Sequence, residues 1–332
     1  MVAALKPPPL IFDPDAPSVG TGLFGLPFTV EESRVVVIPV PYDATTSGKP
    51  GAAKAPAAML RASQQGDLHS YEVGDPYEFG IAMQPIPTFI SRLNDDVKLR
   101  ASVNRANDAA EKINRFVFDQ TAELLRGGKL PVVLGGEHSV PFGAISAAAA
   151  KHPMLGVLQL DAHMDLRQAY EGYIYSHASI AYNVITRISA VSKLVQFGVR
   201  DFGKAEEQFA KDNQHRITTF YDRDMARRKF EGERFTSIAD DIVSPLPSTV
   251  WLTFDVDGLD PSLAPHTGTP VPGGVSWNET IEILHRLQQS GRRIIGMDLC
   301  EVAPGSSAEN DWDATVGQEL LYQMIGFALM GV

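Results

Sequence analysis

Three side chains that can bind a metal follow one apolar stretch of the sequence at every second position. The stretch, residues 154–160, has the character of a buried strand in a parallel sheet, and Asp161, His163 and Asp165 come directly after it. On an extended segment alternate side chains point to the same side, so these three are expected to face one site. Carboxylate and imidazole together suit a borderline divalent cation such as Mn, Fe, Ni or Zn. The motif alone leaves open a second interpretation, in which Asp161 caps a helix and the other two lie in a solvated loop.

Two further strand ends carry the same kinds of side chain. Residues 250–254 form another apolar stretch that runs into Asp255 and Asp257, and residues 132–134 run into Gly-Gly-Glu-His-Ser at 135–139, which contains His138. In open α/β sheets ligands bind at the carboxyl ends of the strands, so the three strand ends are expected to converge. Two histidines and four aspartates are more ligands than one ion needs, and carboxylates can bridge. A pair of metal ions is therefore predicted.

Together these motifs resemble those of a known family. Gly-Gly-Glu-His-Ser (135–139), Asp-Ala-His-Met-Asp (161–165) and Phe-Asp-Val-Asp-Gly-Leu-Asp-Pro (254–261) have the order and spacing seen in the ureohydrolases, the family of arginase, agmatinase and their guanidino-hydrolysing relatives. The resemblance runs from about Val35 to the C-terminus. It implies a hydrolase of C–N bonds in linear amidines, in which a metal-bound hydroxide attacks a guanidino carbon and releases urea and an amine.

The resemblance also implies which residue binds which ion. Two divalent ions per chain are expected, with manganese as the family's usual metal and nickel, iron or cobalt as alternatives that these ligand types do not separate. One ion is expected on His138 and Asp165 and the other on His163 and Asp257, with Asp161 and Asp255 bridging the two.

Two more residues are candidates for the chemistry itself. His177 stands at the start of a predicted helix that runs to about Ile185, where a lone histidine is more often structural, but the resemblance implies a proton shuttle. Glu301 follows the apolar strand 293–300, and a carboxylate at that position needs a partner. A guanidinium held by two parallel hydrogen bonds would be such a partner, and the resemblance places the guanidinium-binding glutamate of the family here. The alternative is a salt bridge from Glu301 to an arginine of the protein.

Two loops are expected to border the pocket. Residues 41–52 follow the first strand and are similar to an early loop of the family, which makes Ser47 a candidate substrate contact, although a purely structural turn carries about equal weight. Residues 265–274 are too rich in turn residues for a simple connection and resemble a Gly-Thr-Gly-Thr-Pro loop of the family, which makes Thr269 a second candidate. Lys49 and His266 depart from the residues that are usual at their positions.

The substrate is predicted from the segment after the Asp-Ala-His-Met-Asp motif. Arginases hold the α-carboxylate of arginine partly through an asparagine two residues beyond that motif, whereas this chain has Arg167 in a D-L-R-x-x-Y-x-G continuation that is more like prokaryotic agmatinases. Arg167 could bind a substrate carboxylate, as in 4-guanidinobutyrate, or be neutralised by Glu171, and we favour the second interpretation. The predicted reaction is agmatine to putrescine and urea, a step of polyamine metabolism.

Other functions stay open beside this one. The substrate could be 4-guanidinobutyrate, arginine, guanidine or a formimino compound. The chain could also be an inactive metal-binding homologue that serves as a subunit, although the intact ligands, His177 and Glu301 speak against it. A dinuclear phosphoesterase would need phosphate-binding Arg, Lys or His around the metals, and the motif loops hold few of them.

The elements that must position these residues alternate between strand and helix. Eight strands are predicted at about 34–40, 80–85, 132–134, 154–160, 194–199, 217–220, 250–254 and 293–299, and the clearest amphipathic helix is at 104–125. The alternation favours a three-layer α/β/α sandwich with a central, mostly parallel sheet. Residues 203–234 are rich in charge and are expected to form exposed helices. We predict an N-terminal arm at 1–33 and a single catalytic domain at 34–332.

Net charge and composition limit the classes of binding partner that the protein can have. The 332 residues carry a formal net charge of −11, which argues against nucleic acid or an anionic membrane as a partner and favours a small cationic guanidino substrate. The one cysteine, Cys300, permits no disulfide within the chain, and no stretch reaches the length of a membrane span, so a cytoplasmic protein is expected. The resemblance implies a homo-oligomer, a trimer or hexamer.

Overall fold

A single parallel sheet forms the centre of the protein in the computed structural model, which describes residues 12–18, 20–100, 102–305 and 311–331. Within these ranges eight strands pair in the order β2-β1-β3-β8-β7-β4-β5-β6, and every neighbouring pair is parallel. The sheet that the sequence predicts is therefore confirmed. The strands are β1 (Val35–Val40), β2 (Ile81–Met83), β3 (Leu130–Gly135), β4 (Leu155–Leu160), β5 (Val191–Val199), β6 (Ile217–Tyr221), β7 (Thr249–Asp255) and β8 (Arg293–Cys300).

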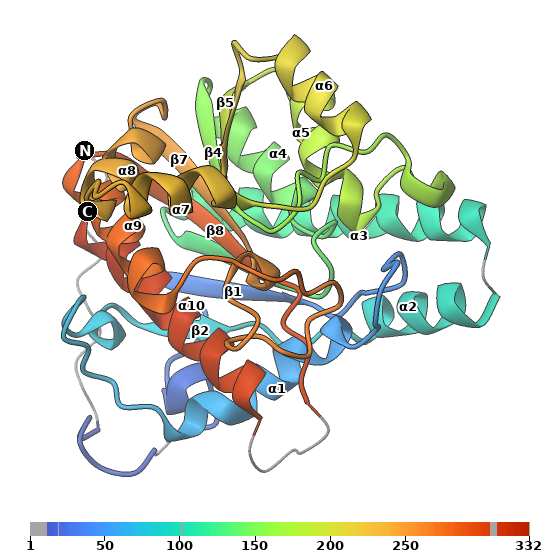
Figure 1. Cartoon of the computed structure of the whole chain (residues 1–332). Coiled ribbons are helices and arrows are strands. Elements are labelled where there is room, and N and C mark those ends of the chain that lie inside the picture. The colour runs from blue at the N-terminus through green and yellow to red at the C-terminus, as the bar shows by residue number, and fades with distance from the viewer. Residues whose placement is uncertain (1–11, 19, 101, 306–310, 332) are drawn as a thin grey trace.

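Helices cover both faces of the sheet and complete the three predicted layers (Figure 1). Helices α2 to α6 pack with one face and α1, α8, α9 and α10 with the other. The helices are α1 (Ala55–Ala62), α2 (Thr88–Arg100), α3 (Val103–Arg126), α4 (Phe142–Lys151), α5 (Ile180–Arg187), α6 (Lys204–Asp212), α7 (Asp222–Phe230), α8 (Phe235–Val243), α9 (Trp277–Gln289) and α10 (Trp312–Met330).

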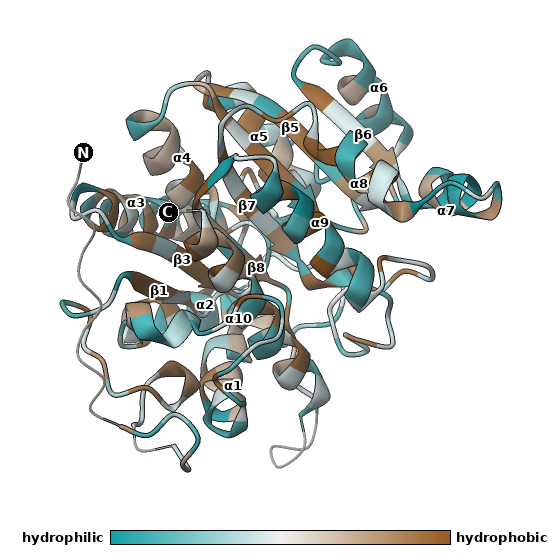
Figure 2. Cartoon of the chain, turned by 90° about the vertical axis from the view of Figure 1, so that its left-hand side faces the viewer, coloured by the Kyte–Doolittle hydropathy of each residue, from teal (hydrophilic) through white to brown (hydrophobic). Residues whose placement is uncertain are grey.

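The strands are apolar on both sides because both faces of the sheet are covered. Val35 and Val37 of β1 belong to one core cluster, while Val36 and Ile38 belong to the cluster on the opposite face. This division follows from the two-residue period of a strand. Figure 2 shows the strands as the most hydrophobic part of the chain, whereas hydrophilic residues dominate α6 and α7. A continuous apolar run, and not an alternating one, is therefore the correct signal for these strands.

The four central strands end at nearly the same level, and this arrangement positions the site. Leu160 of β4 is the partner of Phe254 in β7, Asp255 is the partner of Cys300 in β8, and Leu134 of β3 is the partner of Leu299. The residues that follow these four strands therefore meet over the middle of the sheet. The convergence expected from the sequence is confirmed, and Glu301 joins the group because β8 lies between β3 and β7.

Residues 1–11 of the predicted arm lie outside the described residues, and the described part places Leu23, Phe24 and Leu26 in the core. The division into an arm and one catalytic domain stays a prediction. Among the described residues, no helix combines the length and the apolar character that a membrane crossing requires.

Candidate metal centre and substrate pocket

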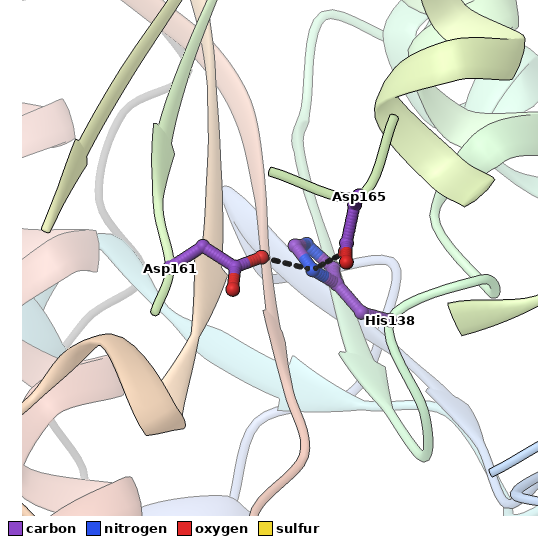
Figure 3. A group of neighbouring side chains, drawn as sticks. All are labelled: His138, Asp161 and Asp165. Atoms are coloured by element: carbon purple, nitrogen blue, oxygen red, sulfur yellow. Dashed lines mark hydrogen bonds and ion pairs between the residues drawn. The ribbon is translucent and has the colours of Figure 1, made fainter. Parts of the chain in front are cut away.

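His138, Asp161 and Asp165 form a buried cluster whose ligand atoms lie within 4.8 Å of one another. Nδ1 of His138 is 3.0 Å from Oδ2 of Asp161 and 3.1 Å from Oδ2 of Asp165. Figure 3 shows the two carboxylates turned toward the imidazole from different segments of the chain. Oδ2 of Asp255 lies 3.4 Å from the same nitrogen. The first group that the sequence predicts is thus assembled around one histidine nitrogen.

A second cluster joins Asp161, His163 and Asp257. Nδ1 of His163 is 3.1 Å from Oδ2 of Asp257 and 3.5 Å from Oδ1 of Asp161. Asp161 therefore belongs to both clusters, with one carboxylate oxygen directed to each histidine. Asp255 connects to the second cluster through its Oδ1, which accepts a 2.9 Å hydrogen bond from the backbone N–H of Asp257.

The local backbone at the Asp-Ala-His-Met-Asp motif differs from the extended geometry that its alternation predicts. Strand β4 ends at Leu160, before the motif, and Asp165 has a φ of 53°, in the left-handed region that few residues other than glycine adopt. As a result, His163 and Asp165 belong to different clusters, on either side of Asp161. All three side chains reach the candidate centre, as expected, but the left-handed turn at Asp165 brings them there, and not simple strand alternation.

Buried polar groups fix the orientation of His138. The hydroxyl of Thr253 donates to Oδ1 of Asp298 at 2.8 Å, and Oγ1 lies 2.8 Å from Nε2 of His138. Because the one hydroxyl proton is used by Asp298, Oγ1 accepts from the Nε2–H of His138. In the neutral ring Nδ1 is then unprotonated and directs its lone pair at carboxylate oxygens. Such an arrangement needs a positive charge between the lone pair and the carboxylates, which a proton on Nδ1 or a metal ion can supply.

The donor set fits a pair of divalent cations. The six candidate ligands supply two imidazoles and four carboxylates, and all except His163 are almost fully buried. Burial lowers the pKa of His163 and its contacts with Asp257 and Asp161 raise it, so that the balance lies at about 12. Burial and the neighbouring carboxylates Asp257 and Asp161 raise the pKa of Asp255 well above its ordinary value. Both shifts reflect the concentration of carboxylate charge around the clusters, which divalent ions would offset.

His177 lies beside the clusters at the start of a short 3-10 helix, His177–Ser179, which leads into α5. Its Nδ1 is 2.9 Å from the carbonyl oxygen of Thr45, and its Nε2 is 3.1 Å from Oγ of Ser47. A carbonyl can only accept, so Nδ1 carries the proton and Nε2 accepts from the Ser47 hydroxyl. Burial lowers the pKa of His177 to about 4, which leaves the imidazole neutral at pH 7.

Glu301 is buried in the same pocket and has a φ of 61°, a second left-handed residue at the site. Its Oε1 accepts a 3.0 Å hydrogen bond from the backbone N–H of His138. Within the part of the chain that the structure describes, no Arg or Lys forms an ion pair with it, so the alternative of a salt bridge to a protein arginine finds no support. A left-handed backbone conformation costs a non-glycine residue about 1–3 kcal/mol. Residues in such conformations are frequent at functional sites.

The two predicted loops meet at the pocket. The backbone N–H of Lys49 donates to the carbonyl of Gly268 at 3.1 Å. Ser47 and Thr269 both line the pocket, as expected, but their hydroxyls already have partners in the site: Ser47 contacts His177, and Thr269 donates to Oδ2 of Asp257 at 3.2 Å. Their role as substrate contacts stays a prediction.

At the rim of the pocket Arg167 has a different partner from the predicted one. Its Nε is 3.3 Å from Oε2 of Glu206, and its guanidinium lies 4.7 Å from the centre of the Tyr170 ring. Glu171, which the sequence suggested, forms no ion pair with Arg167 among the described residues. The pairing with Glu171 is therefore wrong, because a distant helix, α6, brings a buried carboxylate to this position.

Glu206 is a rim residue that the sequence did not predict. Residues 203–234 were expected to be an exposed, charged segment, yet Glu206 is buried and its carboxylate accepts from the backbone N–H groups of Leu166 and Gly203. A glutamate in the first turn of a helix that begins after a glycine was the available signal, since such a side chain often reaches back to the N-terminal amides. Asp201, also at the rim, was missed as well and is mostly exposed.

The pocket as a whole has a volume of about 150 Å³ and is strongly acidic. Its lining holds six carboxylates and one guanidinium, that of Arg167. The carboxylates are Asp165, Asp201, Glu206, Asp255, Asp257 and Glu301.

Comparison with known proteins identifies the family of the chain. The sequence profile of the arginase family matches residues 33–326. The chain belongs to the arginase family. It is 32% identical over 298 residues to the N(1)-aminopropylagmatine ureohydrolase of Thermus thermophilus, with 89% of this chain and 90% of that protein covered. It is 30% identical over 279 residues to the agmatinase of Bacillus anthracis, covering 82% and 85%.

A solved structure shares the fold. The agmatine ureohydrolase of Thermoplasma volcanium superposes with a TM-score of 0.73 at 22% identity and covers 96% of each chain. As a member of the arginase family this chain is a hydrolase of amidino C–N bonds, and the resemblance in its motifs is confirmed.

Proposed function

We propose that the protein hydrolyses agmatine to putrescine and urea at a dinuclear metal centre. The observation that carries the proposal is one acidic pocket in which two His/Asp clusters share Asp161, with His177 and Glu301 in the same lining. The membership of the arginase family and the names of the relatives support the reaction class.

Two divalent ions would be held by the residues of the two clusters. One would bind His138 and Asp165 and the other His163 and Asp257, with Asp161 and Asp255 contributing to both. When bound, the ions supply the Lewis acidity that activates water for attack on the guanidinium carbon. Manganese is the ion we propose, with nickel, iron and cobalt as the alternatives that carboxylate and imidazole ligands also accept.

Glu301 would orient the guanidinium. Its Oε1 is hydrogen-bonded to the His138 amide, which fixes the carboxylate next to the first cluster. A planar guanidinium can donate two parallel hydrogen bonds to a carboxylate, and a buried carboxylate gains most from such a cationic partner. The guanidinium carbon would thereby be held close to the clusters.

His177 would move the proton that the departing amine needs. In the neutral ring Nε2 is unprotonated and has Ser47 as its neighbour, while Nδ1–H is held by the Thr45 carbonyl. With its pKa lowered to about 4 by burial, the ring is a proton acceptor first: Nε2 would take a proton released from the attacking water and pass it to the leaving nitrogen.

The rim favours a substrate with a cationic distal end. Glu206 neutralises Arg167, and the remaining acidic side chains of the pocket leave an environment that attracts a second positive charge. Agmatine carries only an ammonium at that end, whereas 4-guanidinobutyrate carries a carboxylate and arginine carries a carboxylate beside its ammonium. We therefore expect arginine and 4-guanidinobutyrate to be poorer substrates than agmatine. Among the described lining residues, Arg167 is the cation at the rim that would favour a substrate carboxylate.

A second candidate substrate is N(1)-aminopropylagmatine. Relatives from Thermus thermophilus and from Synechocystis, at 32% and 31% identity, are ureohydrolases of this compound. The mostly exposed carboxylate of Asp201 at the rim would suit the additional amine of the longer substrate.

A panel of guanidino compounds tests the proposal. Urea release is measured with agmatine, N(1)-aminopropylagmatine, arginine and 4-guanidinobutyrate, each with Mn and with Ni. We expect the highest kcat/KM with agmatine. A preference for the aminopropyl compound supports the second candidate, and a preference for 4-guanidinobutyrate assigns Arg167 to substrate binding. Release of no urea from any compound with either metal would support an inactive homologue.

We propose a homo-oligomer, a trimer or hexamer, that acts in the cytoplasm in polyamine metabolism and needs neither nucleic acid nor membrane. Size-exclusion chromatography with light scattering would give the number of subunits.

A further inference from the structure

Glu137 is a buried carboxylate that the proposed chemistry does not use. It lies in the loop after β3, directly before His138, is fully buried and is absent from the pocket lining. Its side-chain partners among the described residues are hydroxyl and amide donors from Thr45 and Ser139. Burial of an ionisable side chain with several donors directed at it indicates a specific task.

The task of these contacts is to join two loops. Oε2 of Glu137 accepts from the backbone N–H of Thr45 at 2.7 Å, and Oε1 accepts from the hydroxyls of Thr45 and Ser139. The backbone N–H of Glu137 donates to the carbonyl of Tyr42 at 2.8 Å. The loops are so close that a Cβ atom on Gly136 would lie 1.7 Å from that carbonyl oxygen. The loop after β1 is therefore fixed to the loop after β3 at Thr45.

The fixed residue, Thr45, is also the one that holds His177. Its carbonyl oxygen lies 2.9 Å from Nδ1 of the imidazole, and Ser47, two residues further along the same loop, lies 3.1 Å from Nε2. Both ring nitrogens of His177 thus depend on a loop whose position depends on Glu137. Two neighbouring residues of one motif therefore have different roles. His138 faces the aspartates, and Glu137 fixes the loop at Thr45 that contacts His177.

We propose that Glu137 is a positioning residue that sets the tautomer and the orientation of His177 through Thr45. This inference rests on the proposed role of His177 in proton transfer. With Thr45 in place, the carbonyl keeps the proton on Nδ1 and leaves Nε2 free for the reaction. Without that support the ring can protonate at Nε2 in its neutral form, which is the wrong tautomer for accepting a proton in the pocket.

The test variant is Glu137→Gln, which keeps the volume but replaces one accepting oxygen by an NH₂ group. That group would face a donor of Thr45 or Ser139 and weaken the anchor. Ser139→Ala is the matched control, since it removes one hydrogen bond to Glu137 and leaves both Thr45 contacts. Thr45→Val removes only the hydroxyl contact and provides a milder variant should Glu137→Gln fail to fold.

In the urea assay Glu137→Gln should lower kcat about 10–100-fold, the range for residues that orient a functional group, with KM within about threefold and full metal content. The kcat of Thr45→Val should fall about 3–10-fold, and that of Ser139→Ala should fall less than about threefold. In the His177→Ala background Glu137→Gln should add less than about twofold, because the residue it acts through is already gone. Equal losses with and without His177, or a loss that tracks missing metal, would overturn the proposal.

A spectroscopic measurement tests the positioning role of Glu137 independently of urea release. In zinc-loaded protein with ¹⁵N-labelled histidine, the His177 signals, assigned with His177→Ala, should show the Nδ1–H tautomer. Glu137→Gln should shift the population toward Nε2–H, and Ser139→Ala should not. An unchanged tautomer in Glu137→Gln would refute the positioning role. Failure of every guanidino compound to release urea would refute the proposed function and leave the tautomer result standing.

Discussion

The floor and the rim of the pocket are built in different ways. The floor, made of the candidate ligands and Glu301, follows the ends of β3, β4, β7 and β8 and is almost fully buried apart from His163. The rim consists of Arg167, Tyr170, Asp201 and Glu206, which come from loops, from a short 3-10 helix and from the first turn of α6. At the rim, the side chain of Asp201 is 67% exposed and that of Arg167 is 43% exposed.

This difference assigns separate tasks to the two regions. Side chains on strand ends are held by the packed sheet, so the floor supplies a fixed geometry for metal ions and a guanidinium. Side chains on loops can vary without cost to the core, so the rim is where substrates with different distal ends are distinguished. Changes in the floor should therefore reduce the reaction with every substrate, and changes in the rim should alter the ratio between substrates.

The largest effect should come from the shared ligand of the floor. Asp161→Asn should reduce binding of both ions, whereas Asp257→Ala should reduce binding of one, because Asp161 belongs to both clusters and Asp257 to one. Both variants should lose more than about 10³-fold in turnover while the fold survives. Metal analysis by mass spectrometry together with circular dichroism checks this. Two ions bound per chain in Asp257→Ala would contradict the ligand assignment.

His177 should come next. His177→Ala should keep two ions but lower kcat by about 10²–10⁴-fold, the range for general acid–base groups, with every guanidino substrate alike. The matched control is His266→Ala, a histidine of the nearby loop whose imidazole pairs with Asp313 and does not line the pocket. Unchanged turnover in His177→Ala would return this residue to a structural role.

A smaller effect is expected from the polar support beneath the floor. Thr253→Val removes the acceptor for Nε2–H of His138 and keeps the side-chain shape. Metal affinity should fall about 10–100-fold, and turnover at saturating metal should recover most of its value. Isothermal titration with Mn measures the affinity. An unaltered affinity would mean that the Thr253–Asp298 pair does not orient the histidine.

The smallest effect should come from the rim and should be one of selectivity. Glu206→Gln leaves Arg167 without its neutralising carboxylate, so a substrate carboxylate becomes a better partner for the guanidinium. The ratio of kcat/KM for agmatine over 4-guanidinobutyrate should fall about tenfold, equivalent to about 1.4 kcal/mol. A uniform loss with both substrates would show that Glu206 supports the floor as well.

The contrast between floor and rim also explains how much the sequence could predict. The strands and the six candidate ligands were predictable because apolar runs that end in His and Asp depend only on local sequence. The partner of Arg167 was not, since Glu206 lies 39 residues further along and reaches the rim only through the packing of α6. Nor were Thr253 and Asp298, which look like ordinary strand residues until the register pairs them across β7 and β8. The left-handed backbone at Asp165 was not predictable either, because aspartate tolerates this conformation better than most residues but adopts it only occasionally.

The central claim is that two ions at the floor are required for urea release. Metal-free protein titrated with Mn should bind two ions per chain, and urea release from agmatine should rise with the second equivalent and then level off. Full activity with one ion per chain, or urea release that does not depend on added metal, would contradict it.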